Sequence, residues 1–459
     1  MHIDTEIKAA SMAPPGGDTV DSRLPLPRLG VLGLQHVLVM YAGSVAVPLI
    51  VGHALQLTAQ QIGMLISADL FACALATLIQ TLGLPGIGIK LPVMMGVTFA
   101  SVNPMLAIVM AATDAGQPPA TALGTIYGAV IVAGLFGLVA APLIGRIARY
   151  FPSIVTGSII LVIGISLMRV GIEWAAGGRP GSPEYGAPIN LLIALVVLTI
   201  IMTILRFGRG LLRSAAVLLG VAAGGLIAAL AGHTDFSAVG AASWVGFTPP
   251  LAFGMPRFEL GASVSMCLVM IIVMIESLGM FFAVSEMVGR PATQAMLTRG
   301  LRADALGTLL GGVFNTFPYT SFSQNVGLIA MTSVRSRFVC AAGGIIMMVL
   351  ALSPKLAVTI ASVPSFVLGG AGLVMFGMIA ATGIRILTAV DFTTNSHNLT
   401  IVAVSTSVGM IPLVADGFFQ HAPAMLQPLL HSGILLTTVS AVCLNLFFNG
   451  ARGGSNLTH

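Results

Sequence analysis

Glu276 is the residue whose type and position most directly indicate chemistry. It follows about sixteen residues of mostly apolar sequence, which as a helix would place it roughly 24 Å along the axis. An acidic side chain at the centre of a membrane helix costs about 2.5–3.5 kcal/mol on insertion scales, so we expect it to have a function. A carboxylate there can accept hydrogen bonds from N–H groups of a ligand, or it can carry a proton.

A second group of polar residues interrupts the apolar sequence at 311–337. Pro318 and several glycines break the run, and hydroxyl and amide side chains fill it. Backbone freed by Pro or Gly is tolerated at membrane depth only where protein or a water-filled cavity covers it. Interrupted spans of this kind indicate the binding site of a transporter. The adjacent amides of Gln324 and Asn325 provide donors and acceptors that match a nucleobase edge, and we expect one to bind the ligand and the other to brace a neighbouring span.

The stretch at 92–111 is interrupted in the same way. Proline and glycine residues bracket the β-favouring residues 97–99, and Pro104 can begin a half-helix whose first amides point inward. Phe99 could stack on a planar ligand, and it lies 223 positions before Phe322 in a similar setting. This spacing predicts two inverted repeats that meet at one site. The substrate contacts predicted from the two stretches are Thr98, Phe99, Phe322, Ser323 and Gln324.

Other polar side chains lie inside apolar segments. His36 follows Gln35 in the first segment, and an imidazole in a membrane helix usually faces the interior of the bundle. We expect both to serve proton coupling or the structure of the site. Asp304 either pairs with a neighbouring arginine at the membrane face or points inward, and we expect the inward orientation. Asp69, in the second segment, is expected to be structural.

The composition indicates the class of protein that positions these side chains. Of the 459 residues, 56% are hydrophobic and only 8% are charged, whereas soluble domains carry roughly 25% charged residues. This excludes a soluble enzyme, and the dispersed basic residues argue against binding of nucleic acid. No hydrolase, zinc-protease or nucleotide-binding motif appears, and the four cysteines lack metal-ligand spacing. We therefore expect a membrane protein that is not an enzyme and that has no cofactor or metal.

Fourteen apolar segments can be marked along the chain. With an even number of spans and a cytoplasmic N-terminus, all but four of the 20 Lys and Arg residues fall on the cytoplasmic side, as the positive-inside rule requires. Segments five to seven and twelve to fourteen contain almost no charge and are predicted to be scaffold that faces lipid or a second subunit. The segments are 29–51, 60–83, 92–111, 121–142, 153–172, 187–206, 213–232, 260–288, 299–315, 321–333, 337–353, 364–383, 398–415 and 429–449.

Over about 29–450, the chain resembles the nucleobase-ascorbate transporter family, also called nucleobase:cation symporter family 2. The family signature is matched by residues 324–332, QNVGLIAMT, and Ser333 departs from its last position. The stretch 315–325, NTFPYTSFSQN, most resembles bacterial urate and xanthine permeases. Xanthine-specific relatives often carry an acid four residues after the membrane glutamate, where this chain has Met280.

The resemblance implies a fold and a mechanism as well as roles for residues. Glu276 and Gln324 would hold the edge of a purine, and Phe99 with the Thr98 segment would enclose its ring. His36, Asn325 and Asp304 would maintain the geometry of the core. It also implies proton symport, a homodimer, and a core domain that moves against a gate domain in the cytoplasmic membrane. The implied division is cytoplasmic tails at 1–28 and 451–459, a core domain at 29–142 and 260–353, and a gate domain at 143–232 and 364–450.

The expected function is proton-driven uptake of an oxidised purine, urate or xanthine. A carrier of uracil or another nucleobase is the first alternative, which Glu in place of Gln324 would favour. A sulfate or bicarbonate transporter of the same architecture is the second. Its anion would be held by half-helix dipoles, and the carboxylate of Glu276 would repel it.

Overall fold

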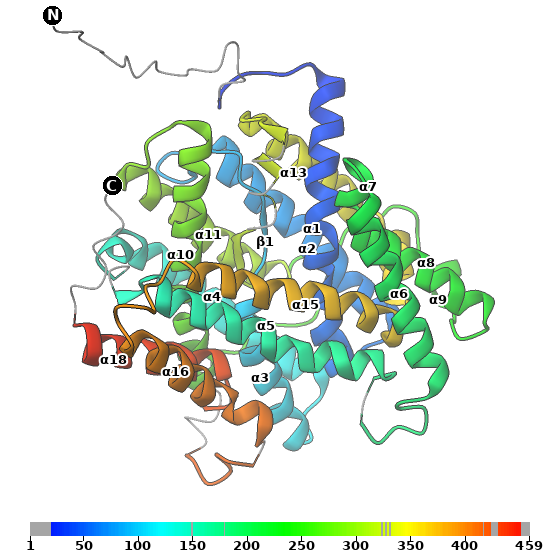
Figure 1. Ribbon diagram of the computed structural model, residues 1–459. Helices are drawn as coiled ribbons and strands as arrows, with labels where there is room; N and C mark the ends of the chain where they lie inside the picture. The colour runs from blue at the N-terminus through cyan, green and yellow to red at the C-terminus, as the bar shows by residue number, and fades with distance from the viewer. Residues whose placement is uncertain are drawn as a thin grey trace, which may run out of the picture.

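The computed structural model describes residues 20–147, 150–178, 180–322, 325, 328–329, 332–415, 417–423 and 430–450. This part of the chain is mostly helical, with one pair of short strands (Figure 1). In chain order the elements are α1 (Leu26–Ala54), α2 (Ala59–Leu82), β1 (Met95–Val97), the 3-10 helix η1 (Phe99–Ser101), α3 (Val102–Asp114), α4 (Pro119–Ile147), α5 (Ser153–Ala175), α6 (Pro188–Phe207), α7 (Leu211–Ser214), α8 (Ala216–Leu230), α9 (Ser237–Ala241), α10 (Leu260–Val288), α11 (Gln294–Val313), β2 (Tyr319–Ser321), α13 (Arg337–Ala351), α14 (Pro354–Ala361), α15 (Ser365–Leu387), α16 (His397–Val414) and α18 (Gly433–Asn449).

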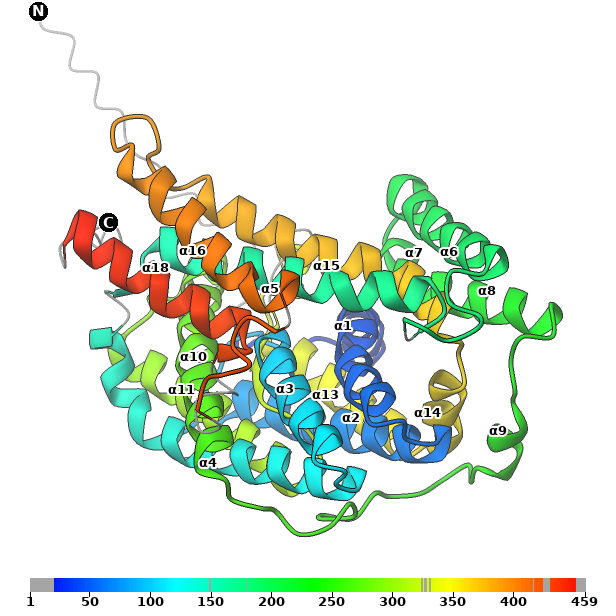
Figure 2. The same ribbon diagram turned by 90° about the horizontal axis from the view of Figure 1, so that it is seen from below.

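The long helices pack as two groups that face each other. In the α1 group, α11 and α10 pack on α4, and α13 packs on both α1 and α2. In the α5 group, α15 packs along α5 and α6, while α16 packs on α18 and α5. Figure 2 shows the α5 group along one side of the molecule, with α1, α2, α3, α4, α10, α11 and α13 on the other. The two groups draw on separate parts of the sequence, so each is assembled from an early and a late segment.

The close packing of α5 against α15 depends on residues without side chains. A Cβ atom at Gly164 would lie 2.2 Å from the backbone nitrogen of Ala380, and one at Gly383 would lie 2.4 Å from the backbone nitrogen of Leu161. Small residues at such positions let two membrane helices approach closely enough for extensive van der Waals contact. This pair therefore forms a closely packed wall opposite the α1 group.

The two interrupted stretches of the sequence pair with each other in space. β1 and β2 are antiparallel, with Gly96 opposite Thr320. Backbone hydrogen bonds from Thr98 to Pro318 and from Phe322 to Met94, each 2.9 Å long, extend the pairing at both ends. The backbone groups that leave the helical pattern here thus bond to one another, which removes the cost of burying them unpaired.

Local residues determine where β1 ends and where α3 begins. Thr98 ends β1 because its side chain accepts a hydrogen bond from the backbone nitrogen of Ala100 and so caps η1. Phe99 therefore begins a helical turn, although the sequence predicted that it would continue the extended stretch. Pro104 lies in the first turn of α3, where its missing N–H is not needed.

The structure gives a smaller count of long spans than the fourteen apolar segments. Within the described ranges, eight helices are long and apolar enough to cross a membrane, or nine if α13 and α14, which meet at 80°, form one bent span. Several predicted segments fall short because they are broken or brief: α3 has 13 residues, α8 has 15 and α18 has 17. The sequence did not predict α14, which Pro354 begins directly after the bend.

Candidate functional site

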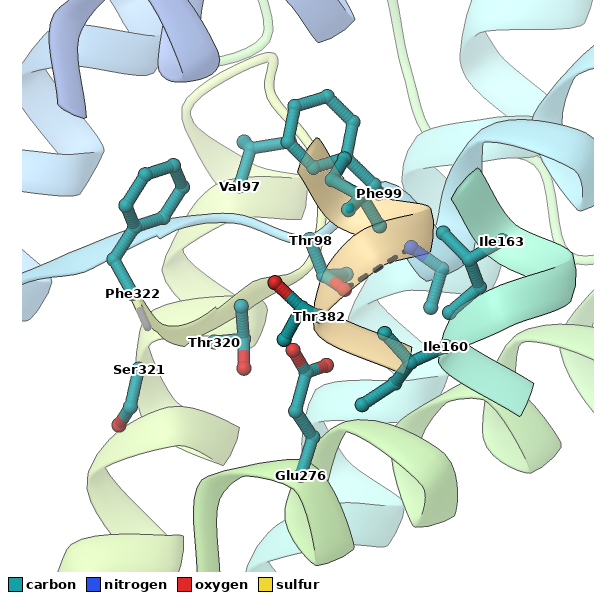
Figure 3. Close-up of a pocket in the computed structure, with 12 residues that line it drawn as sticks. Val97, Thr98, Phe99, Ile160, Ile163, Glu276, Thr320, Ser321, Phe322 and Thr382 are labelled. Carbon is teal, nitrogen blue, oxygen red and sulfur yellow. Dashed lines mark hydrogen bonds between the residues drawn. The ribbon is translucent and has the colours of Figure 1, made fainter. Parts of the chain in front are cut away.

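A small central cavity of about 40 Å³ lies where the two helix groups meet beside the strand pair. Glu276 of α10 enters it from below in Figure 3, and its carboxylate points toward Thr320 and Thr382. The α1 group contributes the two strand ends, and the α5 group contributes an apolar wall. The lining residues are Val97, Thr98, Phe99, Ala100, Ile160, Ile163, Glu276, Thr320, Ser321, Phe322, Ile379 and Thr382.

The carboxylate of Glu276 makes no hydrogen bond and no ion pair with any residue that the structure describes. The hydroxyl of its neighbour Ser277 lies 3.3 Å from the hydroxyl of Thr320 and accepts a 3.4 Å hydrogen bond from the backbone of Ser321. One helical turn of α10 thus supports β2 and at the same time presents an acid to the cavity. A carboxylate accepts hydrogen bonds when ionised and can donate one when protonated, so this group can bind a ligand's N–H groups or a proton.

Two phenylalanines from the interrupted stretches lie on the cavity. The ring of Phe322 fills a space left by glycine residues: a Cβ at Gly96 would lie 2.5 Å from this ring, and one at Gly43 would lie 2.7 Å from it. Phe99 contacts Phe376 of α15 edge to face, with ring centroids 6.1 Å apart. A flat heterocycle between these rings would gain stacking and apolar burial.

His36 and Asn325 lie together but do not line the central cavity. The Nδ2 atom of Asn325 is 3.0 Å from both Nδ1 and the backbone oxygen of His36. Gln35 is directed elsewhere, because its Nε2 atom lies 3.4 Å from the hydroxyl of Ser214 at the end of α7. The first two residues therefore connect α1 to the segment after β2, whereas Gln35 connects α1 to the α5 group.

Asp304 is fully buried and bonds to α2 rather than to an arginine. Its Oδ1 atom accepts a 2.8 Å hydrogen bond from Nε2 of Gln80, whose own Oε1 accepts from the backbone of Ile89. Asp69 is equally buried, and its Oδ1 accepts from the hydroxyls of Thr316 and Tyr319, each at 2.8 Å. Both aspartates thus join α2 to elements that position the strands.

The α5 group supplies site residues that the sequence did not predict. Ile160 and Ile163 of α5, with Ile379 and Thr382 of α15, line the central cavity. The expectation that segments five and twelve are only lipid-facing or subunit-facing scaffold is therefore wrong. Apolar residues that close a cavity over a flat ligand have the same composition as residues that face lipid, so composition could not separate them. The closely spaced glycines of the two segments were the available signal.

Two predicted contacts, Ser323 and Gln324, lie outside the described residues. They follow Phe322 directly in the sequence, and Asn325 is described. Four of the predicted contacts line the central cavity, namely Thr98, Phe99, Glu276 and Phe322. Thr320, which was not predicted as a contact, lines it as well.

A larger space, which we call the inner cavity, adjoins the central one. Its volume is about 460 Å³, and it shares Glu276 and Ile160 with the central cavity. It runs along the second half of α10 between the start of α5 and the ends of α15 and α18. The acid therefore stands where a confined site meets a wider space.

Similar folds occur in solved structures of transporters. The transmembrane domain of a cyanobacterial bicarbonate transporter, BicA, superimposes with a TM-score of 0.59 at 16% identity, over 93% of this chain and 99% of that one. Murine Slc26a9, an anion transporter in its inward-facing state, gives a TM-score of 0.63 at 13% identity, over 93% of this chain and 69% of that one. At these identities the likeness extends to the fold alone.

Sequence relatives are closer. The chain is 50% identical to the uric acid transporter UacT of Escherichia coli over 99% of this chain and 93% of the relative. It is 42% identical to the uric acid permease PucJ of Bacillus subtilis, over 91% of this chain and 92% of the relative. It is 41% identical to the xanthine permease of the same organism, over 91% of this chain and 93% of the relative.

A model of the permease family, Xan_ur_permease, matches residues 28–417. This match and the relatives confirm the resemblance seen in the signature, and they confirm that the chain is not an enzyme. The chain belongs to this permease family, the nucleobase-ascorbate transporters, and is a multi-pass membrane protein.

Proposed function

We propose that the protein takes up an oxidised purine, urate or xanthine, at the central cavity by alternating access. The observation that carries this proposal is a carboxylate without a partner among the described residues, in a cavity that two phenylalanine rings help to line. An oxopurine has ring N–H donors along its edge and a flat aromatic face, which fit these two features. The relatives named for uric acid and xanthine support the same substrate class.

Each part of the cavity has a proposed contact. Glu276 accepts hydrogen bonds from ring N–H groups, and the hydroxyls of Thr98 and Thr320 take positions beside it. Phe99 and Phe322 cover the ring. Gln324 is proposed as the second hydrogen-bonding residue because it follows Phe322 by two positions.

Alternating access is proposed to move the α1 group against the α5 group. The core domain would comprise 29–142 and 260–353, and the gate domain 143–232 and 364–450. Fourteen segments follow if the shorter pieces count as spans: β1 with η1 and α3, the segment after β2, and α8, α11, α13 and α18, besides the eight long helices. Two inverted repeats of seven would place β1 and β2 in equivalent positions, and their antiparallel pairing fits that arrangement.

The proposal also covers the driving force for uptake, the oligomeric state and the orientation in the membrane. Uptake is driven by protons, with Glu276 as the proton carrier, and His36, Asn325, Asp304 and Gln35 maintain the geometry that couples it. The protein acts as a homodimer in the cytoplasmic membrane, with both termini in the cytoplasm. The distribution of Lys and Arg supports this orientation.

Transport assays test the substrate and the site together. Cells that express the chain should accumulate radiolabelled xanthine, and unlabelled urate should compete better than uracil. Glu276→Gln should abolish uptake while the protein still inserts. Glu286→Gln is the matched control, because Glu286 lies on the same helix but is exposed near its end. Normal uptake by Glu276→Gln would refute the site.

Proton coupling has a separate test. A protonophore should collapse accumulation in sodium-free buffer. Unchanged accumulation under these conditions would refute coupling to protons and would leave the substrate assignment in place.

A further inference from the structure

The inner cavity contains a polar feature that the central cavity does not use. Most of its wall is apolar, including Phe151 at the start of α5 and Phe282 on α10. Against this wall, α16 and α18 bring asparagine side chains to one side of the space. Figure 2 shows α16 and α18 side by side next to α10. Polar groups among apolar walls are the usual means by which a small-molecule site fixes the orientation of its ligand.

The orientation of these amides follows from one backbone group. The carbonyl oxygen of Asp391 can only accept, and it lies 2.8 Å from Asn398, so Asn398 must present its NH₂ group there. The Oδ1 atom of Asn398 is then left to accept from Asn449, at 2.9 Å. Asn449 consequently presents its own NH₂ group on this side, and the same group donates to Oδ1 of Asn445 at 3.0 Å. Asn395 completes the chain by donating to Oδ1 of Asn449 at 2.9 Å.

Asn445 is the end of this chain of hydrogen bonds. Because its Oδ1 is occupied by Asn449, its NH₂ group remains as the free end, and no described residue accepts a hydrogen bond from it. The residue is only 3% exposed, yet it lines the inner cavity. Its NH₂ group is therefore available to donate to an acceptor atom of a molecule in the inner cavity.

We infer that the inner cavity holds a second binding site for the oxopurine, in which the Asn445 amide donates to a carbonyl oxygen of the base. The inference rests on the proposed function, since it takes the same substrate class. Phe151 and Phe282 give the base an apolar surface, and the hydroxyl of Thr156 lines the same space. The proposed orientation opens this cavity to the cytoplasm, so the second site receives the base after it leaves Glu276.

The direction of the donor decides which ligands fit. An amide NH₂ group donates and cannot accept, so it can bond to a ring carbonyl or an unprotonated ring nitrogen but not to an amino group that must itself donate. Urate and xanthine carry carbonyl oxygens at ring positions where adenine carries an amino group or a hydrogen, neither of which can accept from the Asn445 amide. The second site should therefore prefer oxopurines over aminopurines.

Equilibrium binding of radiolabelled xanthine to the purified full-length protein tests this site. The wild type should show two components, and Glu276→Gln should remove the tighter one while the weaker one remains. In the Glu276→Gln background, Asn445→Leu should weaken the remaining component about five-fold, the value of one net hydrogen bond. Adenine should compete poorly for it.

Two further variants separate binding from structure. Asn445→Asp keeps an oxygen for Asn449 but removes the donor, so a purely structural role predicts normal binding and the proposed site predicts weakened binding. This variant also carries the test if Asn445→Leu does not fold. Asn395→Ala breaks the same chain of hydrogen bonds at a residue that does not line the cavity, and it should leave binding unchanged.

These measurements distinguish absence of the second site from failure of the proposed function. A single component in the wild type that Glu276→Gln removes would refute the second site and support the central one. Normal weak binding by both Asn445 variants would also refute it. No binding of xanthine or urate by the wild type would overturn the proposed function, and the second site with it.

Discussion

The side-chain amide of Asn325 bridges two acceptors of His36, its ring nitrogen Nδ1 and its backbone oxygen, at 3.0 Å each. An NH₂ group can only donate, so Nδ1 of the neutral ring must be the acceptor and Nε2 must carry the proton. Both residues are almost fully buried. One amide thus fixes the segment after β2 to α1 and also selects a histidine tautomer.

This geometry predicts that substitution of Asn325 destabilises the protein more than substitution of His36. Asn325→Leu loses both hydrogen bonds, whereas His36→Leu retains an acceptor in its backbone oxygen. At about 0.5–1.5 kcal/mol net for each bond, Asn325→Leu should lower the melting temperature in detergent more than His36→Leu. Equal shifts, or a larger shift for His36→Leu, would contradict the bridging geometry.

The space occupied by the Phe322 ring gives a second prediction. Gly96→Ala would place a methyl group 2.5 Å from this ring, closer than atoms can approach, so the ring must move. Because Phe322 lines the central cavity, we expect uptake of xanthine to fall at least ten-fold while the protein still inserts. Gly377→Ala is the control, since a Cβ there meets no atom within 4 Å. The double variant Gly96→Ala with Phe322→Leu should recover part of the uptake. If it does not, displacement of the Phe322 ring is not the cause of the lost uptake.

Thr382 tests whether the α5 group touches the substrate. Its hydroxyl donates to the backbone oxygen of Met378 one turn earlier, so folding does not need it, and it points into the cavity near Glu276. Thr382→Val should therefore leave the melting temperature unchanged and raise the KM for xanthine about three- to ten-fold, as expected for loss of one hydrogen bond. Thr359→Val is a matched control, because Thr359 makes the same kind of bond to Lys355 away from the cavity.

The ion pairs of Asp21 predict that the stability of the folded protein depends on pH. Asp21 accepts hydrogen bonds from Arg290 at 2.6 Å and from Arg337 at 2.7 Å, and so connects the segment before α1 to the ends of α10 and α13. The hydrogen bond from Arg290 is the main cause that holds the pKa of Asp21 below its usual 3.8. A pKa that is lower in the folded state stabilises the protein fully above the unfolded value and loses that stabilisation as the pH falls through the folded value.

Asp21→Asn should therefore lower the stability at neutral pH, by about 1 kcal/mol or less because the carboxylate is half exposed. The difference from the wild type should shrink as the pH falls below about 4, because Asp21 then binds a proton in the unfolded state and, at still lower pH, in the folded state. Thermal unfolding at pH 3.5 and pH 7 measures it. Asp114→Asn, at an exposed residue, is the control and should show no difference at either pH. A deficit as large at pH 3.5 as at pH 7 would contradict the ion pairs as its cause.

The sequence predicted the buried acid and both interrupted stretches because each breaks a rule that apolar spans otherwise obey. Glu276 is an acid in a membrane helix, where a charge is costly, and Pro104 and Pro318 lie where helical structure is interrupted inside long apolar runs. What the sequence could not predict are contacts between ordinary residues. Ile379 and the free amide of Asn445 become informative only when α15 and α18 are placed beside α10.

The hydrogen-bond partners of buried polar side chains could not be predicted from the sequence either. Gln80 and Asp304 are 224 positions apart, and no local pattern links them. The number of spans was also difficult to predict, because an apolar run does not show whether it forms one straight helix or a bent pair such as α13 and α14.

The last prediction concerns Asp69 and separates a structural acid from a proton carrier. Its Oδ1 accepts from Thr316 and Tyr319 and so anchors the stretch that leads into β2. Asn has an oxygen at the same position, so Asp69→Asn should keep both hydrogen bonds and retain uptake within about two-fold. Asp69→Ala removes the acceptor and should cost about 2–4 kcal/mol of stability, measured as a loss of folded protein on heating.

Glu276→Gln provides the contrast, because its uptake should be lost although it has the same change from acid to amide. If Asp69→Asn also abolished uptake in a protein that folds normally, then Asp69 would need its ability to ionise. The buried carboxylate of α2 would then take part in proton movement. Retained uptake in Asp69→Asn, with loss in Glu276→Gln, would locate the essential acid on α10 and limit the role of Asp69 to holding β2 in position.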